Sequence, residues 1–394
     1  MNTMKKLPVI LILGFCYACS GISDQEFNPE NGMVDTPTCE SYKINGSKAV
    51  EIASLYFDRT PTRSNAPLEM GYIVDHSRTR SGAPGNDTIA YILNRGDYEG
   101  FVVVSSDNRV YPILAHSQTG TFKYKKGDPV ETEFISRLGA YLKSHQDRES
   151  RIVIADDLDA CVTSYPALTA SWHQRAPWDK YVIQEHPGCP VGCVALATGM
   201  IMSHCKLSHV YHGINFELAR ITAGLKTNYY PWEEPLTRIV GGNTSGNNKP
   251  RPEVEPYSYD VAIDYAAKLL YWIGKDVHTS YSNGESSAMS LDAFRLLKKE
   301  GYDLKQITLT AYNVHDAIKY LVSNNLLYMR GSGHAWVADA CSYCVDYANN
   351  DTIAAEIHCD WGWGGNCNGY YSGEVFYPDG HKYTDMTYFA VGIE

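Results

Sequence analysis

The sequence lacks a basic stripe and an internal repeat, and its N-terminal apolar run is too short to cross a bilayer. The 394 residues carry 34 Lys and Arg against 45 Asp and Glu, a formal net charge of −11. This balance argues against a nucleic-acid partner. The chain is 44% hydrophobic and only 20% charged, so it is not broadly disordered and has enough apolar residues for two or three domains.

The N-terminus resembles an export signal. Lysines precede the apolar run Leu7–Tyr17, which fits the apolar region of a signal peptide. Ala18 before Cys19 resembles the cleavage site of bacterial lipoproteins, although Cys16 stands where that pattern has Leu or a similar residue. We predict a signal peptide over 1–18, a lipid on Cys19 and a location on the outer membrane or cell surface. Ordinary cleavage with full secretion is the alternative.

The sequence does not determine which of its cysteines form disulfides. There are 11 cysteines, and an even number remains once Cys16, Cys19 and the candidate nucleophile Cys193 are set aside. An exported protein permits disulfides among the others, but their pairing is not determined by sequence. These eight are Cys39, Cys161, Cys189, Cys205, Cys341, Cys344, Cys359 and Cys367, of which Cys341/Cys344 and Cys359/Cys367 are the most local choices.

A zinc site is an alternative use of the last four cysteines together with His358. Zinc sites of this kind usually contain a second closely spaced Cys pair, and none follows Cys341-x-x-Cys344. The same pair also lacks the following helix of a thioredoxin-type redox motif. We therefore predict no metal and no cofactor.

The first part of the chain reads as a polar tether over 19–40 and a small α+β unit over 41–160. Alternating apolar residues indicate strands, and apolar residues at helical spacing indicate helices. The charged residues from Gln146 onward look exposed and linker-like, a natural place for a boundary or a proteolytic cut. We expect helices over 47–57 and 131–145, strands over 89–94, 100–105 and 110–116, and a loop over 61–87.

The second part, 161–394, is richer in Trp, Tyr, Gly, Cys and His. Its first half is mainly helical, and its second half alternates as the strands of an antiparallel sheet do. A long polar loop over 241–258 interrupts it. We expect helices over 260–274, 290–299 and 314–323, and strands over 326–330, 334–340, 352–358 and 385–392.

Cys193 is the candidate nucleophile. A Pro/Gly/Cys loop ends at Gly192, and an apolar run of small residues follows without a turn residue until Gly199. This pattern predicts a buried helix that begins at or near Cys193. A thiol at that position faces unpaired N–H groups and the positive end of the helix dipole, which favour the thiolate.

His334 is the candidate base, because it follows a Gly-rich turn at the start of a predicted strand. Among 13 histidines a purely structural role is the ordinary expectation, and the flanking glycines and the matching cysteine count against it. An imidazole here would take the thiol proton and later protonate the leaving amine. Asp360 could accept a hydrogen bond from the imidazole, and Trp361 could cover that bond from water.

An oxyanion donor is the third requirement of acyl transfer. Gln174 lies upstream of Cys193 in the segment Trp172–Trp178. Its side-chain amide and the backbone N–H of Cys193 would form the oxyanion hole. Taken alone, a Gln in a loop carries little information.

In combination these motifs resemble the streptopain family of papain-like cysteine peptidases. Cys193 and His334 are 141 residues apart, within the interval of about 130–150 residues found in papain-like enzymes. Segments 100–107 and 111–115 resemble the family's inhibitory prodomain. The motifs are Gln-x-x-Pro-aromatic, Gly-Cys-Val-Ala, Gly-x-His-Ala-aromatic-Val-x-Asp and Trp-Gly-Trp-Gly-Gly, and all occur in this order.

The resemblance implies a role for each matching residue. Cys193 would be the nucleophile, His334 the base and acid, and Gln174 the oxyanion donor, while Trp361 would shield the histidine. Asp360 stands where the best-known member has Asn, and its charge would raise the pKa of the histidine. Substrate-binding positions would be Ser287, Ser332, Gly333 and Gly364, and a hydrophobic residue two positions before the cut would be preferred.

We therefore expect an exported zymogen of a cysteine endopeptidase acting on proteins or peptides. An inhibitory α+β prodomain over 41–160 would precede an α+β, papain-like catalytic domain over 161–394, with one helical lobe and one lobe built on a twisted antiparallel sheet. A cut within 151–166 would activate it. The alternatives are a catalytically silent binding module or peptidase inhibitor on this fold, and a transglutaminase-like or amidase activity.

Overall fold

The structure, a computed structural model, describes most of the chain. The predicted signal peptide, tether, Cys19, Cys39, Ser332 and the polar loop 241–258 lie outside the described residues. So does 147–159, most of the charged linker. The described ranges are 42–59, 66–74, 88–146, 160–164, 166–168, 172–205, 210–215, 259–331, 333–346, 351–376 and 386–393.

The N-terminal region forms a small sheet with a helix on each face. Apolar residues at helical spacing place one side of the first helix against strands β2 and β3, and this contact forms a separate core cluster. The expected helix over 131–145 is present, but it begins with one π-helical turn. In chain order the elements are α1 (Gly46–Arg59), β1 (Leu68–Val74), β2 (Thr88–Arg95), β3 (Phe101–Ser105), β4 (Ile113–Ser117), η3 (Glu131–Ile135) and α2 (Ser136–Ser144).

The predicted loop over 61–87 is wrong where β1 lies. This strand pairs antiparallel with β2 at the edge of the sheet. Most of its residues are partly or fully exposed, so it lacks the buried alternation by which a strand is recognised in a sequence.

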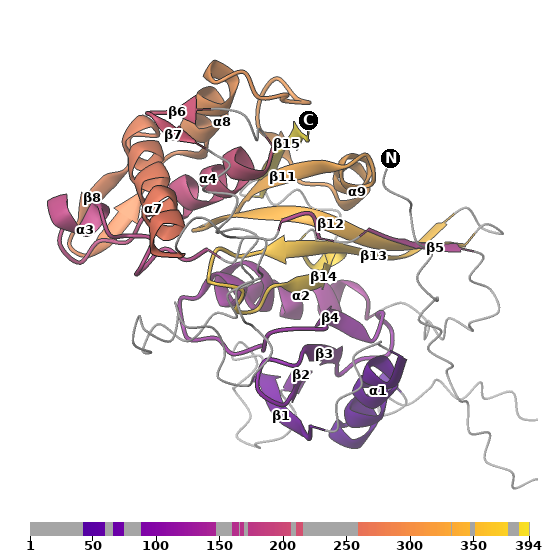
Figure 1. Ribbon diagram of the computed structural model, residues 1–394. Coiled ribbons are helices and arrows are strands. Elements are labelled where there is room, and N and C mark those ends of the chain that lie inside the picture. The colour runs from indigo at the N-terminus through magenta and orange to yellow at the C-terminus, as the bar shows by residue number, and fades with distance from the viewer. Residues whose placement is uncertain are drawn as a thin grey trace, which may run out of the picture.

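The remaining elements supply a helical lobe and the rest of the sheet (Figure 1). The expected helices and strands are present, although β12 continues six residues beyond its predicted end at 340. Helix α3 and the short strands β5 to β10 and β14 were not expected. The elements are β5 (Ala160–Thr163), α3 (Val182–Glu185), α4 (Cys193–Cys205), β6 (Val210–Tyr211), β7 (Ile214–Asn215), α7 (Tyr259–Asp276), β8 (Ser280–Ser282), β9 (Glu285–Ser287), α8 (Ser290–Lys299), β10 (Thr310–Ala311), α9 (Val314–Val322), β11 (Asn325–Arg330), β12 (Ala335–Asp346), β13 (Asp351–Asp360), β14 (Gly369–Ser372), η6 (Gly373–Phe376) and β15 (Thr387–Gly392).

One antiparallel sheet runs through both parts of the chain. Its order is β1-β2-β3-β4-β14-β13-β12-β11-β15-β10, and β5 pairs with β12. The junction lies between β4 and β14, where Tyr371 pairs with Ala115 and Tyr370 with His116. The N-terminal region thus extends the C-terminal sheet in the folded molecule.

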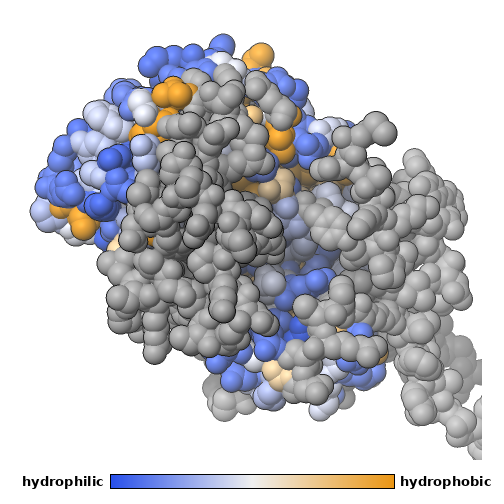
Figure 2. All heavy atoms as spheres, in the orientation of Figure 1, coloured by the Kyte–Doolittle hydropathy of each residue, from blue (hydrophilic) through white to orange (hydrophobic). Residues whose placement is uncertain are grey.

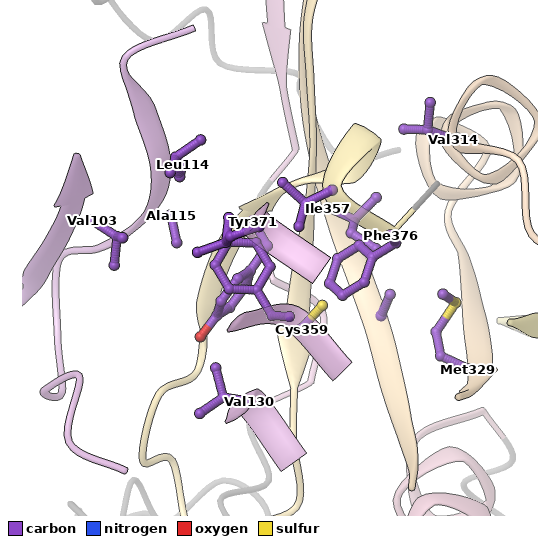
Figure 3. Packing of buried hydrophobic residues seen from close by; sticks show 14 of the residues in the cluster. Val103, Leu114, Ala115, Val130, Val314, Met329, Ile357, Cys359, Tyr371 and Phe376 are labelled. Carbon is purple, nitrogen blue, oxygen red and sulfur yellow. The ribbon is translucent and has the colours of Figure 1, made fainter. Parts of the chain in front are cut away.

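Successive side chains of β11 point alternately into the two main cores, which lie on opposite faces of the sheet. Leu326 and Tyr328 belong to the core under the helical lobe, with α4, α7 and α8. Leu327 and Met329 point to the other face, as the period of two requires. Figure 3 shows this second core, in which residues of β3 and β4 approach Tyr371 and Cys359 from one side and Val314 and Met329 approach from the other. The expected α+β fold, with a helical lobe and a sheet lobe, is confirmed.

The states of the cysteines contradict the predicted local disulfide pairs. Cys341, Cys359 and Cys367 are free and buried, whereas Cys344 is disulfide-bonded. The two local pairs favoured by the sequence are therefore wrong. Cys341 and Cys344 lie three positions apart in β12, so their side chains point to opposite faces of the sheet. A disulfide at Cys344 also removes one thiolate from the zinc alternative.

The described helices include none that is long and apolar enough to cross a membrane. On the face shown in Figure 2, hydrophobic residues of the helical lobe lie scattered among hydrophilic ones. Single exposed apolar residues such as Met289 and Ile307 are ordinary on a folded surface.

Candidate active site

Cys193 is the first residue of α4, as the loop-to-helix pattern predicts. The backbone N–H groups of Cys193 and Val194 lie near its thiol and lower the pKa of that thiol, as does the backbone N–H of Ala335 on the neighbouring strand. The last contact places the sulfur beside the residue that follows His334. Residues far apart in sequence are thus brought together at the point where α4 meets β12.

The turn before His334 is closed by its own backbone. The N–H of Gly331 donates to the carbonyl of His334 at 2.9 Å. The imidazole Nε2 lies 2.9 Å from the carbonyl oxygen of Trp361, which can only accept, so Nε2 carries the proton. Nδ1 is then the nitrogen available to accept a proton.

The His334 imidazole and the Cys193 thiol lie on neighbouring segments but are not hydrogen-bonded to each other. No hydrogen bond between His334 and Cys193 occurs among the described side chains, and the ring instead lies parallel to that of Trp336, 6.2 Å away between centroids. Burial lowers the pKa of His334 to about 4, although the Trp361 carbonyl opposes the shift. The imidazole is therefore neutral near pH 7.

The charge state of Cys193 differs from the expected thiolate. Burial raises the pKa of the thiol above its usual value, and this outweighs the lowering by the surrounding N–H groups, while the charge of Glu133 raises it further. The N–H groups at the helix start therefore lower the pKa of Cys193 as expected, but desolvation raises it by more. The site holds a thiol and a neutral imidazole, an inactive pair.

Glu133 explains part of this state, and it comes from the N-terminal region. Its fully buried side chain accepts the N–H of Gly333 at 3.0 Å and pairs with Arg137 at 3.3 Å. A Cβ on Gly331 would collide with its carboxylate. The turn that carries His334 is therefore packed directly against η3.

Asp360 has partners other than the histidine. Its Oδ1 accepts the N–H of Gly362 at 3.0 Å, and both this N–H and the nearby Asn368 side chain act to lower the pKa of the carboxyl. Burial raises its pKa to about 7. In this structure the acceptor of the imidazole N–H is the Trp361 carbonyl, and Asp360 instead shapes the turn that presents it.

Trp361 packs its ring in the core under this turn. The ring is buried and lies 5.0 Å from Trp336 and 5.3 Å from Tyr371, between centroids. The turn then passes over α4. Gly362 has φ of +71°, and a Cβ there would stand 2.6 Å from Cδ2 of Leu196. Only glycine meets both conditions without strain.

Gln174 lies next to the nucleophile loop. Its carbonyl accepts the N–H of Val191 at 2.8 Å, two residues before Cys193. The same segment is paired with the Trp-Gly loop, because Trp172 accepts the N–H of Gly364 at 2.9 Å and His173 bridges to Trp363. The side chain of Gln174 is half-buried.

The predicted substrate-binding positions lie on three segments around this point. Gly333 and Gly364 use their N–H groups in the contacts with Glu133 and Trp172. Ser287 ends β9, whose Ser286 side chain approaches Gly192.

Sequence reasoning missed two contributors to the site, Glu133 and the N–H of Ala335. Glu133 lies in a segment with ordinary helical character, and nothing near it in the sequence signals that it reaches Gly333. The spacing of Glu133 and Arg137, four residues apart, indicates only a helical ion pair.

A thiol at a helix start, a histidine on the adjoining strand and a Trp-Gly loop that crosses the helix together define the cysteine peptidase class. The comparison with family models agrees. The Peptidase C10 family matches residues 172–371, just over half of the chain, and the Spi protease inhibitor matches residues 41–139. The chain belongs to the Peptidase C10 family, and the expected resemblance to streptopain and its inhibitory prodomain is confirmed.

Individual relatives are distant. The chain is 25% identical over 91% of its length to the thiol protease/hemagglutinin PrtT of Porphyromonas gingivalis, and spans 42% of that protein. It is 23% identical to streptopain of Streptococcus pyogenes, with 75% of each chain covered. A solved fragment of prointerpain A of Prevotella intermedia matches 82% of this chain and 98% of that one, with 18% identity and a TM-score of 0.47.

Proposed function

We propose that the protein is a cysteine endopeptidase made as a zymogen, with Cys193 as nucleophile and His334 as base and acid. The observation that carries this is the position of Cys193, at the first turn of α4 and beside the backbone N–H of Ala335, the residue that follows His334. The thiol therefore lies at the start of a helix, next to the segment that carries the imidazole. A thiol placed so is suited to acyl transfer.

The proposed mechanism uses the two nitrogens of His334 differently. Nε2–H stays on the Trp361 carbonyl, which orients the ring, and Nδ1 accepts the proton of Cys193. The thiolate attacks the peptide carbonyl, and the Gln174 amide with the Cys193 N–H stabilises the oxyanion. The imidazolium protonates the leaving amine, and water then hydrolyses the thioester while the imidazole again accepts the proton.

The N-terminal region would be the intramolecular inhibitor. Its Glu133 contacts the Gly331–Gly333 turn, and the thiol and imidazole below this contact are both uncharged. We assign 41–160 to the inhibitory domain and 161–394 to the catalytic domain, with the activating cut in the linker. Departure of η3 would free the turn, so that the imidazole can move onto the sulfur.

The substrates would be proteins or peptides, with a hydrophobic residue preferred two positions before the cut. The Gly333 and Gly364 segments and Ser287 would bind the substrate backbone.

Export would follow from the signal peptide, with a lipid on Cys19 as the membrane anchor. A Cys19→Ser variant would then pass from the detergent-soluble membrane fraction to the medium, whereas an unchanged distribution would contradict the anchor.

Cleavage of casein by the purified, processed protein tests the activity. Cys193→Ala should lower kcat by about 10⁴-fold or more, and a thiol-directed epoxide should abolish cleavage by the parent. The control is Cys189→Ala, which removes a free buried thiol in the same loop and should keep most activity. Undiminished cleavage by Cys193→Ala would refute the nucleophile, and no cleavage by any form would favour the silent binding module.

A further inference from the structure

Strand β5 lies immediately after the linker that the proposed activation cuts, yet it belongs to the C-terminal sheet. It pairs antiparallel with β12, from Ser342 opposite Thr163 to Val345 opposite Ala160. The hydroxyls of Thr163 and Ser342 lie 2.9 Å apart. The residues that would become the new N-terminus are therefore part of the catalytic sheet before any cut is made.

The chain remains attached to the sheet beyond β5. The N–H of Ser164 donates to the Cys341 carbonyl at 2.8 Å, and the Ser164 carbonyl accepts the hydroxyl of Tyr370 at 2.5 Å. The N–H of Leu168 donates to the buried carboxylate of Asp339 at 2.7 Å.

The state of Cys344 adds a covalent link to this arrangement. Cys344 is disulfide-bonded, while Cys341, three residues earlier in the same strand, is a free cysteine. The strand register places Cys161 directly opposite Cys344. Opposed residues of an antiparallel pair have Cα atoms about 4.5–5.5 Å apart, within the range of about 4.4–6.8 Å that a disulfide requires.

We propose that Cys161 and Cys344 form a disulfide that anchors the mature N-terminal strand and that confines productive activation to cuts before Cys161. The pairing is inferred from the strand register, and its consequence for activation rests on the proposed function. A cut before Cys161 leaves the inhibitory region without a covalent link to the enzyme. A cut after Cys161 leaves that region tethered through the disulfide, with Glu133 still beside the Gly331–Gly333 turn.

Formation of the bond needs an oxidant of the export compartment. Two S–H bonds break and one S–S bond forms, and two protons and two electrons pass to the disulfide of a thiol oxidoreductase, which leaves as its dithiol. Such bonds persist in oxidising compartments, in agreement with the predicted signal peptide.

Peptide mapping of the unreduced Cys193→Ala zymogen, secreted and alkylated before digestion, tests the pairing. We expect the peptides of Cys161 and Cys344 as one cross-linked species that separates on reduction. Cys344 found as an alkylated thiol, or bonded to another cysteine such as Cys39, would overturn the proposal.

The consequence for activation is tested with a foreign protease site in the same Cys193→Ala protein. A site within 147–159 should release the N-terminal region on a denaturing gel without reductant. A site after Pro166 should keep it with the catalytic band until reductant is added. Release from the second protein without reductant would overturn the proposal, as would retention in the first.

Two serine variants complete the design. Cys344→Ser should release the N-terminal region from the second protein without reductant, whereas Cys341→Ser, at a free cysteine of the same strand, should not. None of these readouts uses peptidase activity. Failure of the disulfide therefore leaves the proposed function standing, and failure of casein cleavage leaves the disulfide standing.

Discussion

At the residue scale, opposing electrostatic effects act on one sulfur. The start of α4 supplies N–H groups that stabilise a thiolate at Cys193, while burial and the charge of Glu133 favour the thiol. Burial is the larger of the two effects that raise the pKa of Cys193. The charge of Glu133, a residue of the N-terminal region 60 positions upstream in the sequence, adds a smaller contribution in the same direction.

Glu133→Gln should make the thiol of the zymogen more reactive. Burial remains the main cause of the raised pKa of Cys193, but loss of the Glu133 charge removes one of its contributions. We expect alkylation of Cys193 near pH 7.5 to become about two- to tenfold faster, measured by mass spectrometry of its peptide. Glu131→Gln, in the same turn, is the control, and equal rates in the two variants would contradict the role of Glu133.

Asp360→Asn should change how stability depends on pH. Burial raises the pKa of Asp360 to about 7 from a usual 3.8. The folded state thus binds this proton more tightly than the unfolded state, so the contribution of Asp360 to stability is complete below pH 3.8 and is lost as the pH rises to about 7.

Urea unfolding of Cys193→Ala with and without Asp360→Asn measures this effect. Between pH 4 and pH 7.5 the variant should gain stability relative to the parent by up to about 4 kcal/mol. The difference should then stay constant above pH 8. A difference that does not vary with pH would show that Asp360 titrates normally.

At the element scale, the Trp-Gly loop is the part whose shape decides the site. It supplies the carbonyl for His334, packs Trp361 against Trp336 and crosses α4 at Leu196. Its glycines are required by backbone geometry and by close approach. The element therefore tolerates little change, although only one of its groups touches the histidine.

Gly362→Ala should be costly, and Gly127→Ala is its matched control. Both glycines have positive φ, +71° and +90°, but a Cβ at Gly362 meets Leu196 at 2.6 Å whereas one at Gly127 meets nothing within 4 Å. We expect Gly127→Ala to cost about 1–2 kcal/mol and Gly362→Ala about 1–3 kcal/mol more. Equal losses in chemical denaturation would mean that the loop can move off α4.

At the scale of the whole molecule, the N-terminal region and the C-terminal half share a sheet and a core. Strand β4 pairs with β14, and Phe134 and Leu138 belong to the same cluster as Trp361 and Tyr371. Removal of the N-terminal region exposes both the strand edge and this apolar surface. Activation should therefore lower stability while it frees the site.

Calorimetry of the Cys193→Ala protein checks this expectation. The intact chain should unfold in one transition, because the shared core couples its two parts. After a cut at a foreign site within 147–159 and separation of the fragments, the C-terminal fragment should melt at a lower temperature, and re-addition of the N-terminal fragment should restore it. A C-terminal fragment as stable as the intact chain would show that the shared core contributes little.

The sequence by itself determined the features that rest on local patterns. The start of α4 at Cys193, the alternation in β11 and the glycines of the Trp-Gly loop follow from helix initiation, the period of a strand and backbone sterics. The family motifs placed Gln174, Cys193, His334 and Trp361 in order, and the structure brings the segments that carry them together.

Only the tertiary structure decided which distant groups meet. The partner of His334 is a backbone carbonyl, which no side-chain motif reveals. Glu133 reaches Gly333, and Cys344 is disulfide-bonded while Cys341 is a free cysteine. Each depends on the order and register of strands, since a shift of one residue moves a side chain to the opposite face. That long-range pairing, rather than composition or spacing, sets the latent state of the site.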